Sequence, residues 1–220
     1  MSGDVAAEIA RRALAKRHAD YLDEVRRLLD AALELMSRGG GAARPRVADI
    51  VAAAGLSNDA FYRHFPTKDA LVVALLEDGA QRLSGYVAHR MAQAAAPQEQ
   101  VHRWVEAVLG QAAAEIAATA RAVLWNAGSA GEQLISGHSR ASATLAALLS
   151  EPFADLGSTD PDLDATLAAH AVVGLLSDYL WRRAEPSATE VDRVTQYCLR
   201  AVTSTGAGPV HDWPTPNPAS

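Results

Sequence analysis

Apolar side chains recur at the three- and four-residue spacing of helices through most of the chain, and runs of β-branched residues are scarce. One apolar stripe begins at Asp20 and ends before the glycines 39–41, which suit the left-handed backbone at the end of a helix. Because alanine and leucine dominate and aromatic residues are few, the predicted fold class is all-α. The pattern predicts further helices over 47–54, 57–65, 67–96, 97–118, 119–126, 131–149, 162–183 and 189–203.

Two of these predicted helices, 47–54 and 57–65, are short and are joined by a tight turn at Gly55. Ser57 is a natural N-cap, because its side-chain oxygen accepts a hydrogen bond from a free N–H at the start of the next helix. Pro66 ends that helix, since the residue before a proline is driven out of the α region. This order is the one by which a helix-turn-helix places its second helix in the DNA major groove.

The first turn of the 57–65 helix carries small side chains that suit a groove about 12 Å wide. Asn58 can bond bidentately to adenine, and Ala60 can contact a thymine methyl group. Asp59 either accepts a hydrogen bond from cytosine N4 or only supports the helix dipole, and both interpretations stay open. The pattern therefore predicts a base-reading surface.

Phosphate contacts are expected around the same helix. Phe61 and Phe65, four residues apart, should face inward, which leaves Tyr62, Arg63 and His64 outward or sideways. His64 lies between aromatic residues and can alternatively be packed, but we favour a phosphate contact. The predicted DNA-binding residues are Arg44, Arg46, Ser57, Asn58, Asp59, Ala60, Tyr62, Arg63, His64, Thr67 and Lys68.

Charge is distributed unevenly along the chain. The formal net charge is -6, which argues against a protein that coats nucleic acid non-specifically and allows contact through a local patch. The first twenty residues hold a basic run, which we interpret as a mobile arm that becomes helical when docked; a solvated tail without a partner is the open alternative. The run consists of Arg11, Arg12, Lys16, Arg17 and His18.

The segment 46–71 resembles the DNA-binding head of TetR-family transcriptional regulators. The match covers about an eighth of the chain directly, and helix order and length extend it more loosely to the whole. It implies an N-terminal three-helix helix-turn-helix head on a larger helical ligand-binding and dimerisation domain. The residues in register with the family pattern are Ile50, Ala54, Gly55, Leu56, Ser57, Phe61, Tyr62, His64, Phe65, Thr67, Lys68, Asp69 and Leu71.

The resemblance assigns base reading to positions 57–59. Two positions depart from the family pattern. Val47 stands where many relatives carry a phosphate-binding threonine, and Asp59 stands where a basic or neutral residue is frequent. The phosphate contacts implied by the resemblance are Tyr62, His64 and Lys68.

In proteins that resemble this chain, the last two helices pair across a twofold axis. The predicted helix 162–183 is apolar on two sides, one marked by Leu163 and Leu167 and the other by Ala168 and Val172. Such a helix favours packing against its own core and against a partner, although a wholly internal helix is the alternative. A homodimer would place two recognition helices about 34–36 Å apart and predicts a palindromic DNA operator.

The body is expected to bind a largely apolar small molecule, because Trp and Tyr combine a large apolar surface with a polar group. Each candidate residue can equally be core or interface. No cofactor and no metal site are predicted, since the single Cys198 excludes multi-cysteine zinc frameworks. The candidate ligand-binding residues are Trp104, Trp125, Asn126, His138, His170, Asp178, Tyr179 and Trp181.

The predicted function is a ligand-responsive homodimeric repressor that a small molecule releases from double-stranded operator DNA. The alternatives are an activator with the same head and a helical interaction protein without DNA binding. Catalytic motifs are missing from the sequence, and an enzyme is not expected. A free thiol and the lack of about 18 consecutive apolar residues predict a cytoplasmic protein with no membrane span. The predicted parts are an arm (1–20), a DNA-binding domain (21–66), a regulatory and dimerisation domain (67–204) and a disordered tail (205–220).

Overall fold

The computed structural model describes residues 3–38, 43–127 and 142–203. Within these ranges all regular secondary structure is helical, which confirms the predicted fold class. In chain order the helices are α1 (Gly3–Arg38), α2 (Val47–Ala54), α3 (Asn58–His64), α4 (Lys68–Met91), α5 (Pro97–Leu109), the short 3-10 helix η1 (Gly110–Ala112), α6 (Ala114–Ala127), α8 (Ser150–Asp155), α9 (Pro161–Arg182) and α10 (Ala188–Thr203).

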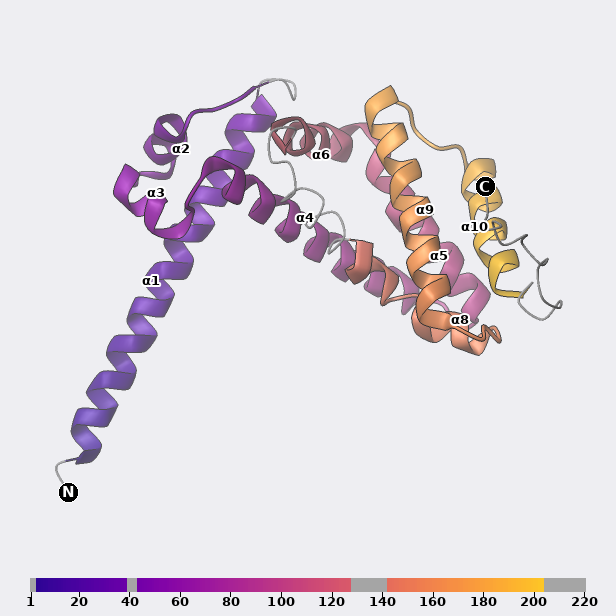
Figure 1. The fold of residues 1–220 in the computed structure, drawn as a ribbon, viewed down its shortest axis with the longest axis horizontal. Coiled ribbons are helices and arrows are strands. Elements are labelled where there is room, and N and C mark those ends of the chain that lie inside the picture. Colours follow the sequence, from indigo (N-terminus) through magenta and orange to yellow (C-terminus); the bar gives the residue numbers. More distant parts are fainter. Residues whose placement is uncertain (1–2, 39–42, 128–141, 204–220) are drawn as a thin grey trace, which may run out of the picture.

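The helices pack around two hydrophobic cores (Figure 1). We call the first unit the head: the second half of α1, α2, α3 and the start of α4 enclose a core that includes Leu28, Ile50 and Phe61. We call the second unit the body: it contains α5, α8, α9, α10 and the remainder of α4. Helix α4 runs from one unit to the other, and the end of α6 closes the head core with Ala122 and Val123.

Local capping explains why the boundaries of the head helices were predictable. The Ser57 hydroxyl accepts a hydrogen bond from the Ala60 N–H at 3.1 Å, and the Thr67 hydroxyl accepts one from the Ala70 N–H at 3.1 Å. Gly55 ends α2 with φ +64°, a left-handed conformation that glycine adopts without strain. Each of these signals involves residues that are close in sequence.

The predicted helices of the body differ from the observed ones at several breaks. Helix α4 ends at Met91 rather than near residue 96, and Pro97 begins α5 directly after Ala96, whose backbone is extended. The predicted helix 97–118 is interrupted at Gly110, a poor helix former. Helix α8 was not predicted, and most of the predicted helix 131–149 lies outside the described residues.

The basic run at residues 11–18 lies within the continuous helix α1, which begins at Gly3. Alanine and arginine favour helices, and Glu8 pairs with Arg11 at 3.0 Å and with Arg12 at 2.9 Å. The predicted domain boundary at residue 20 therefore falls inside a helix, and the four-part division stays a prediction.

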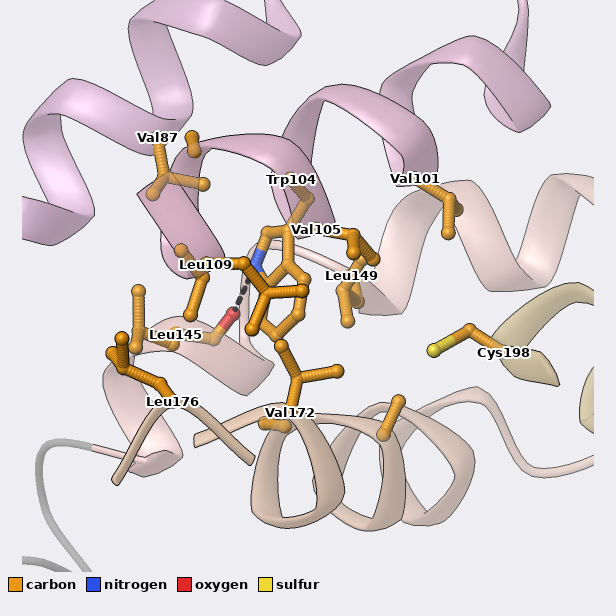
Figure 2. Close-up of a cluster of buried hydrophobic side chains, with 14 of the residues drawn as sticks. Val87, Val101, Trp104, Val105, Leu109, Leu145, Leu149, Val172, Leu176 and Cys198 are labelled. Atoms are coloured by element: carbon orange, nitrogen blue, oxygen red, sulfur yellow. Dashed lines mark hydrogen bonds between the residues drawn. The ribbon is translucent and has the colours of Figure 1, made fainter. Parts of the chain in front are cut away.

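The body core is centred on the fully buried Trp104 (Figure 2). Its indole Nε1–H donates to the Leu145 carbonyl oxygen at 3.0 Å, so the polar group of the ring is satisfied inside the core. Cys198 is buried at the edge of the same cluster, and burial raises the pKa of its thiol to about 11. A thiol of this kind is unreactive at neutral pH.

Among the described residues, no single helix is both long and apolar enough to cross a membrane; the bent pair Pro97–Ala112 and Ile116–Ala127 meets the criterion only when joined.

Candidate DNA-binding head and body cavity

Helix α3 is held in the head by buried phenylalanines near its C-terminal end and exposes polar side chains at its N-terminal end. Phe61 is fully buried, and Phe65 packs beside it with ring centroids 5.8 Å apart. The side chains at positions 57–59 are exposed at the other end of the helix. This geometry leaves the first turn of α3 free to enter a groove.

Ala60 does not belong to that exposed surface. It is buried against the head core, although we expected it to contact a thymine methyl group. Ala60 follows the N-cap by three residues, and this position turns its methyl group toward the protein rather than outward.

Several residues that we predicted to contact phosphates are exposed on the head. Tyr62 is 57% exposed, and Arg63 next to it is exposed as well. Lys68 donates to the Pro45 carbonyl oxygen at 3.2 Å, which ties the start of α4 to the segment before α2. The other exposed members of the predicted set are Arg44, Arg46 and Thr67.

His64 is packed, contrary to the phosphate contact that we favoured. Its side chain is 1% exposed and lies 2.6 Å from the Glu24 carboxylate oxygen. The Tyr21 ring meets the imidazole edge-on, with centroids 4.4 Å apart. The hydrogen bond from His64 is the main reason that the pKa of Glu24 is lowered, and Arg63 adds to the effect. His64 thus fixes the end of α3 to α1.

Arg27 is a structural residue of the head that the sequence analysis missed. Its guanidinium donates from Nε to the Ala54 carbonyl oxygen at 3.0 Å and from Nη2 to the Gly55 carbonyl oxygen at 3.1 Å. These bonds satisfy free carbonyl groups at the end of α2. The left-handed backbone at Gly55 favours glycine at the turn, and a Cβ there would displace Nη2 of Arg27, which lies 2.9 Å away.

A cavity of about 800 Å³ lies where α4, α5, α6 and α9 meet in the body. Its walls are mostly aliphatic, with a few polar side chains that include Arg82, Glu106 and Thr119. Cavities of this size and character hold small organic ligands. The lining residues are Leu33, Leu75, Leu76, Gly79, Ala80, Arg82, Leu83, Tyr86, Glu106, Ala107, Gly110, Gln111, Ile116, Thr119, Ala120, Val123, Leu124, Leu176 and Leu180.

Those predicted ligand-binding residues that the structure describes do not line this cavity. Trp104 is core, and the Tyr179 hydroxyl donates to Glu190 at 2.8 Å. His138 lies outside the described residues. The prediction rested on aromatic and polar side chains, whereas the described walls are mostly aliphatic. The signal in the sequence was the spacing of leucines, alanines and glycines along α4. The three remaining α9 candidates, all exposed, are His170, Asp178 and Trp181.

Trp125 and Asn126 connect α6 to the head. The Asn126 side chain, 3% exposed, donates from Nδ2 to the Ala43 carbonyl oxygen at 2.8 Å. The Arg44 guanidinium lies over the Trp125 ring at 5.5 Å, within the range of a cation–π contact. Since Val123 on the same helix lines the cavity, α6 joins the cavity to the segment that carries Arg44.

The two apolar sides of α9 have different surroundings. Ala168 and Val172 are buried in the body core, whereas Leu163 and Leu167 are exposed, the latter by 59%. A Cβ at Gly174, on the exposed side, would meet nothing within 4 Å. A wholly internal α9 is therefore wrong.

Comparisons with known proteins support the assignment of the head to a DNA-binding unit and show which solved structures share the fold. Residues 28–75 match the model of the family described as bacterial regulatory proteins, tetR family. No curated protein matches the sequence. Among solved structures, the chain is similar to a Mesorhizobium loti protein assigned to the TetR-family transcriptional regulators, at 16% identity and TM-score 0.62, with 84% of this chain and 96% of that chain covered.

Two further similar structures are named regulators. The fatty acid degradation regulator FadR from Bacillus halodurans has 17% identity and TM-score 0.60, with 79% of this chain and 97% of that chain covered. The regulator FadR from Bacillus subtilis, solved with stearoyl-CoA, has 12% identity and TM-score 0.58, with 81% and 97% covered. At these identities the likeness establishes the fold. With the family match, it confirms the resemblance to TetR-family transcriptional regulators and supports a DNA-binding transcriptional regulator.

Proposed function

We propose that the protein is a homodimeric, ligand-responsive repressor that acts in the cytoplasm. Its head binds a palindromic operator in double-stranded DNA, and a largely apolar small molecule in the body releases it. The observation that carries the proposal is the cavity whose walls, α4 and α6, both reach into the head. An occupant that separates these helices would also move the head.

The mechanism is a shift between two populations. Helix α4 begins at Lys68, which is bonded to Pro45 in the head, and its later turns line the cavity. A ligand that fits the cavity better when the heads are turned away from adjacent major grooves favours that state. The ligand must therefore bind the two states with different affinities, or it changes nothing.

The walls suggest the chemistry of the ligand. Aliphatic surface dominates, and Arg82, Glu106 and Gln111 are polar groups that would orient the polar end of a molecule. The Bacillus subtilis FadR structure contains stearoyl-CoA, and so long-chain acyl compounds are reasonable first probes.

The first experiment identifies the operator. DNA fragments selected by the purified protein should contain a site with twofold symmetry. Replacing Tyr62 and Lys68 with alanine should then weaken binding to that site and reduce its salt dependence. A protein that selects no DNA would favour a helical interaction protein, whereas variants that bind the selected site as wild type does would show that Tyr62 and Lys68 do not contact its phosphates. A reporter gene behind the site separates repression from activation.

The second experiment tests the cavity without a known ligand. Gly79 lines the cavity with open space at its Cβ position, so Gly79→Leu should partly fill it and weaken operator binding. Gly85 lies on the same helix, also has open space and does not line the cavity, which makes Gly85→Leu the matched control. If an acyl probe occupies the cavity by calorimetry and operator binding stays equally tight, release by ligand is wrong.

A further inference from the structure

The N-terminal half of α1 extends beyond the head. From Leu28 onward α1 is buried against α2, α3 and α6, but residues 9–23 are exposed, Leu14 by 64%. Figure 1 shows this part projecting away from the remaining helices. We call residues 7–20 the extension. Since an isolated helix of this length is marginally stable in water, a partner surface would stabilise it.

The extension is basic within a chain that is acidic overall. The extension contains four lysine and arginine residues and two acidic ones, Glu8 and Asp20, and so its formal charge is +2, whereas the whole chain has a net charge of -6. Lys16 and Arg17 are exposed, and no described residue forms an ion pair with either. The positive charge is thus free to meet an anionic partner.

The position of the extension is set by the recognition helix. Tyr21 and Glu24, at the base of the extension, contact His64, the last residue of α3. Both contacts lie within about one helical turn of residue 20. Because α1 is one continuous helix, the extension has a fixed direction relative to α3. The contacts with His64 therefore hold the base of the extension against the end of the helix that we propose enters the major groove.

We propose that the extension is a second DNA-binding element, which contacts the phosphate backbone of the duplex flanking each half-site. The proposal rests on the DNA-binding function of the head. Residues 11–17 cover about 9 Å of helix axis, and a DNA strand presents a phosphate about every 3.4 Å along its axis. Basic side chains on several faces of the helix suit non-specific backbone contact rather than base reading.

The test compares operator duplexes that end at the half-sites with duplexes extended by about one turn (10 base pairs) on each side. Wild type should bind the longer duplex more tightly. Lys16→Gln/Arg17→Gln should lose this preference and reduce the slope of log K against log salt by about 4 for the dimer, because each phosphate contact contributes about 0.9 and both protomers lose two contacts. Adding Arg11→Gln and Arg12→Gln should bring the reduction in slope to about 7 for the dimer.

The controls separate this proposal from the function on which it rests. Glutamine forms helices about as well as lysine and arginine, and circular dichroism should show unchanged helicity. Arg103→Gln/Arg182→Gln removes two charges from the body and should leave the flank preference unchanged. If the extension variants keep the wild-type salt slope while Tyr62→Phe binds the operator more weakly, the proposed DNA contact of the extension is wrong and DNA binding by the head stands. Failure of wild type to bind any duplex would overturn both.

Sedimentation of the extension variants tests whether the extension instead mediates self-association. Ile9 and Leu14 are exposed apolar residues that a second copy of the chain would bury. A variant that changes the oligomeric state without changing the salt slope would replace DNA by self-association as the role of the extension.

Discussion

His64 and Arg63 are neighbours on α3 with opposite surroundings. The His64 ring is enclosed by Tyr21 and Glu24, whereas the Arg63 side chain is 60% exposed. His64→Ala should lower the free energy of unfolding by about 1–3 kcal/mol, because it removes a buried ring and its hydrogen bond. Urea unfolding followed by circular dichroism measures the change.

Arg63→Ala is the control for His64→Ala and should stay within about 0.5 kcal/mol of wild type. If His64→Ala instead kept full stability and only weakened DNA binding, His64 would be a phosphate contact after all.

Glu190 holds the connection between α9 and α10 with three hydrogen bonds. Its carboxylate accepts from the Ser187 N–H at 2.8 Å, the Ser187 hydroxyl at 2.7 Å and the Tyr179 hydroxyl at 2.8 Å. The bonds from Ser187 are the main reason that the pKa of Glu190 is lowered to about 2, and burial is the main reason that the pKa of Tyr179 is raised.

A carboxyl group with a lowered pKa stabilises the fold above its ordinary pKa, and this contribution is lost as the pH falls through the lowered value. We therefore expect the contribution of Glu190 to be complete above about pH 4.5 and to disappear as the pH approaches about 2. Thermal unfolding of wild type and Glu190→Gln should differ at pH 6 and converge toward pH 2. A difference that is independent of pH would exclude this origin.

At the scale of elements, the sequence predicted helices whose ends are set locally. Helix α2 has the predicted bounds, and α3 and α4 begin at the predicted caps, Ser57 and Thr67, because each cap acts within three residues. The break at Gly110 was missed, since glycine within a long apolar pattern does not by itself end a helix.

The cavity and the long-range contacts of the head could not be predicted from the sequence, for a different reason. The partners of His64 and Asn126 lie 40 and 83 residues away, and no local pattern reports such distances. Similarly, a buried Trp104 and an exposed Trp181 have the same identity in the sequence, and only packing distinguishes them.

The link from α6 to the head gives a prediction at this scale. Asn126→Leu keeps the branched shape of the side chain and removes its bond to Ala43, so α6 should hold the segment before α2 less firmly. We expect stability to fall by about 1–2 kcal/mol. We also expect operator affinity to fall and to respond less to Gly79→Leu, measured as a double-mutant cycle.

Ala118 is an exposed residue on the same helix, and Ala118→Leu is the matched control for Asn126→Leu. Additive effects of Asn126→Leu and Gly79→Leu on operator affinity would show that α6 does not carry the coupling.

At the scale of the whole molecule, the exposed side of α9 has no partner among the described residues. It carries Leu163 and Leu167, and Ala171 continues it into a groove of about 670 Å³ beside α10. Gly174 leaves room for the close approach of another helix. Contiguous apolar surface of this kind marks an association site.

Leu167→Glu should therefore convert the proposed dimer into a monomer, because two carboxylates would face each other across the twofold axis in an apolar interface. Sedimentation should show half the mass of wild type, with helicity unchanged. Operator affinity should fall by orders of magnitude, since one head alone makes half of the contacts.

Gln98→Glu, which adds the same charge at an exposed position of α5, should remain dimeric and bind DNA as wild type does. A Leu167→Glu protein that keeps the wild-type mass would place the twofold axis elsewhere, and a wild type that is itself monomeric would rule out recognition of a palindrome by a preformed dimer.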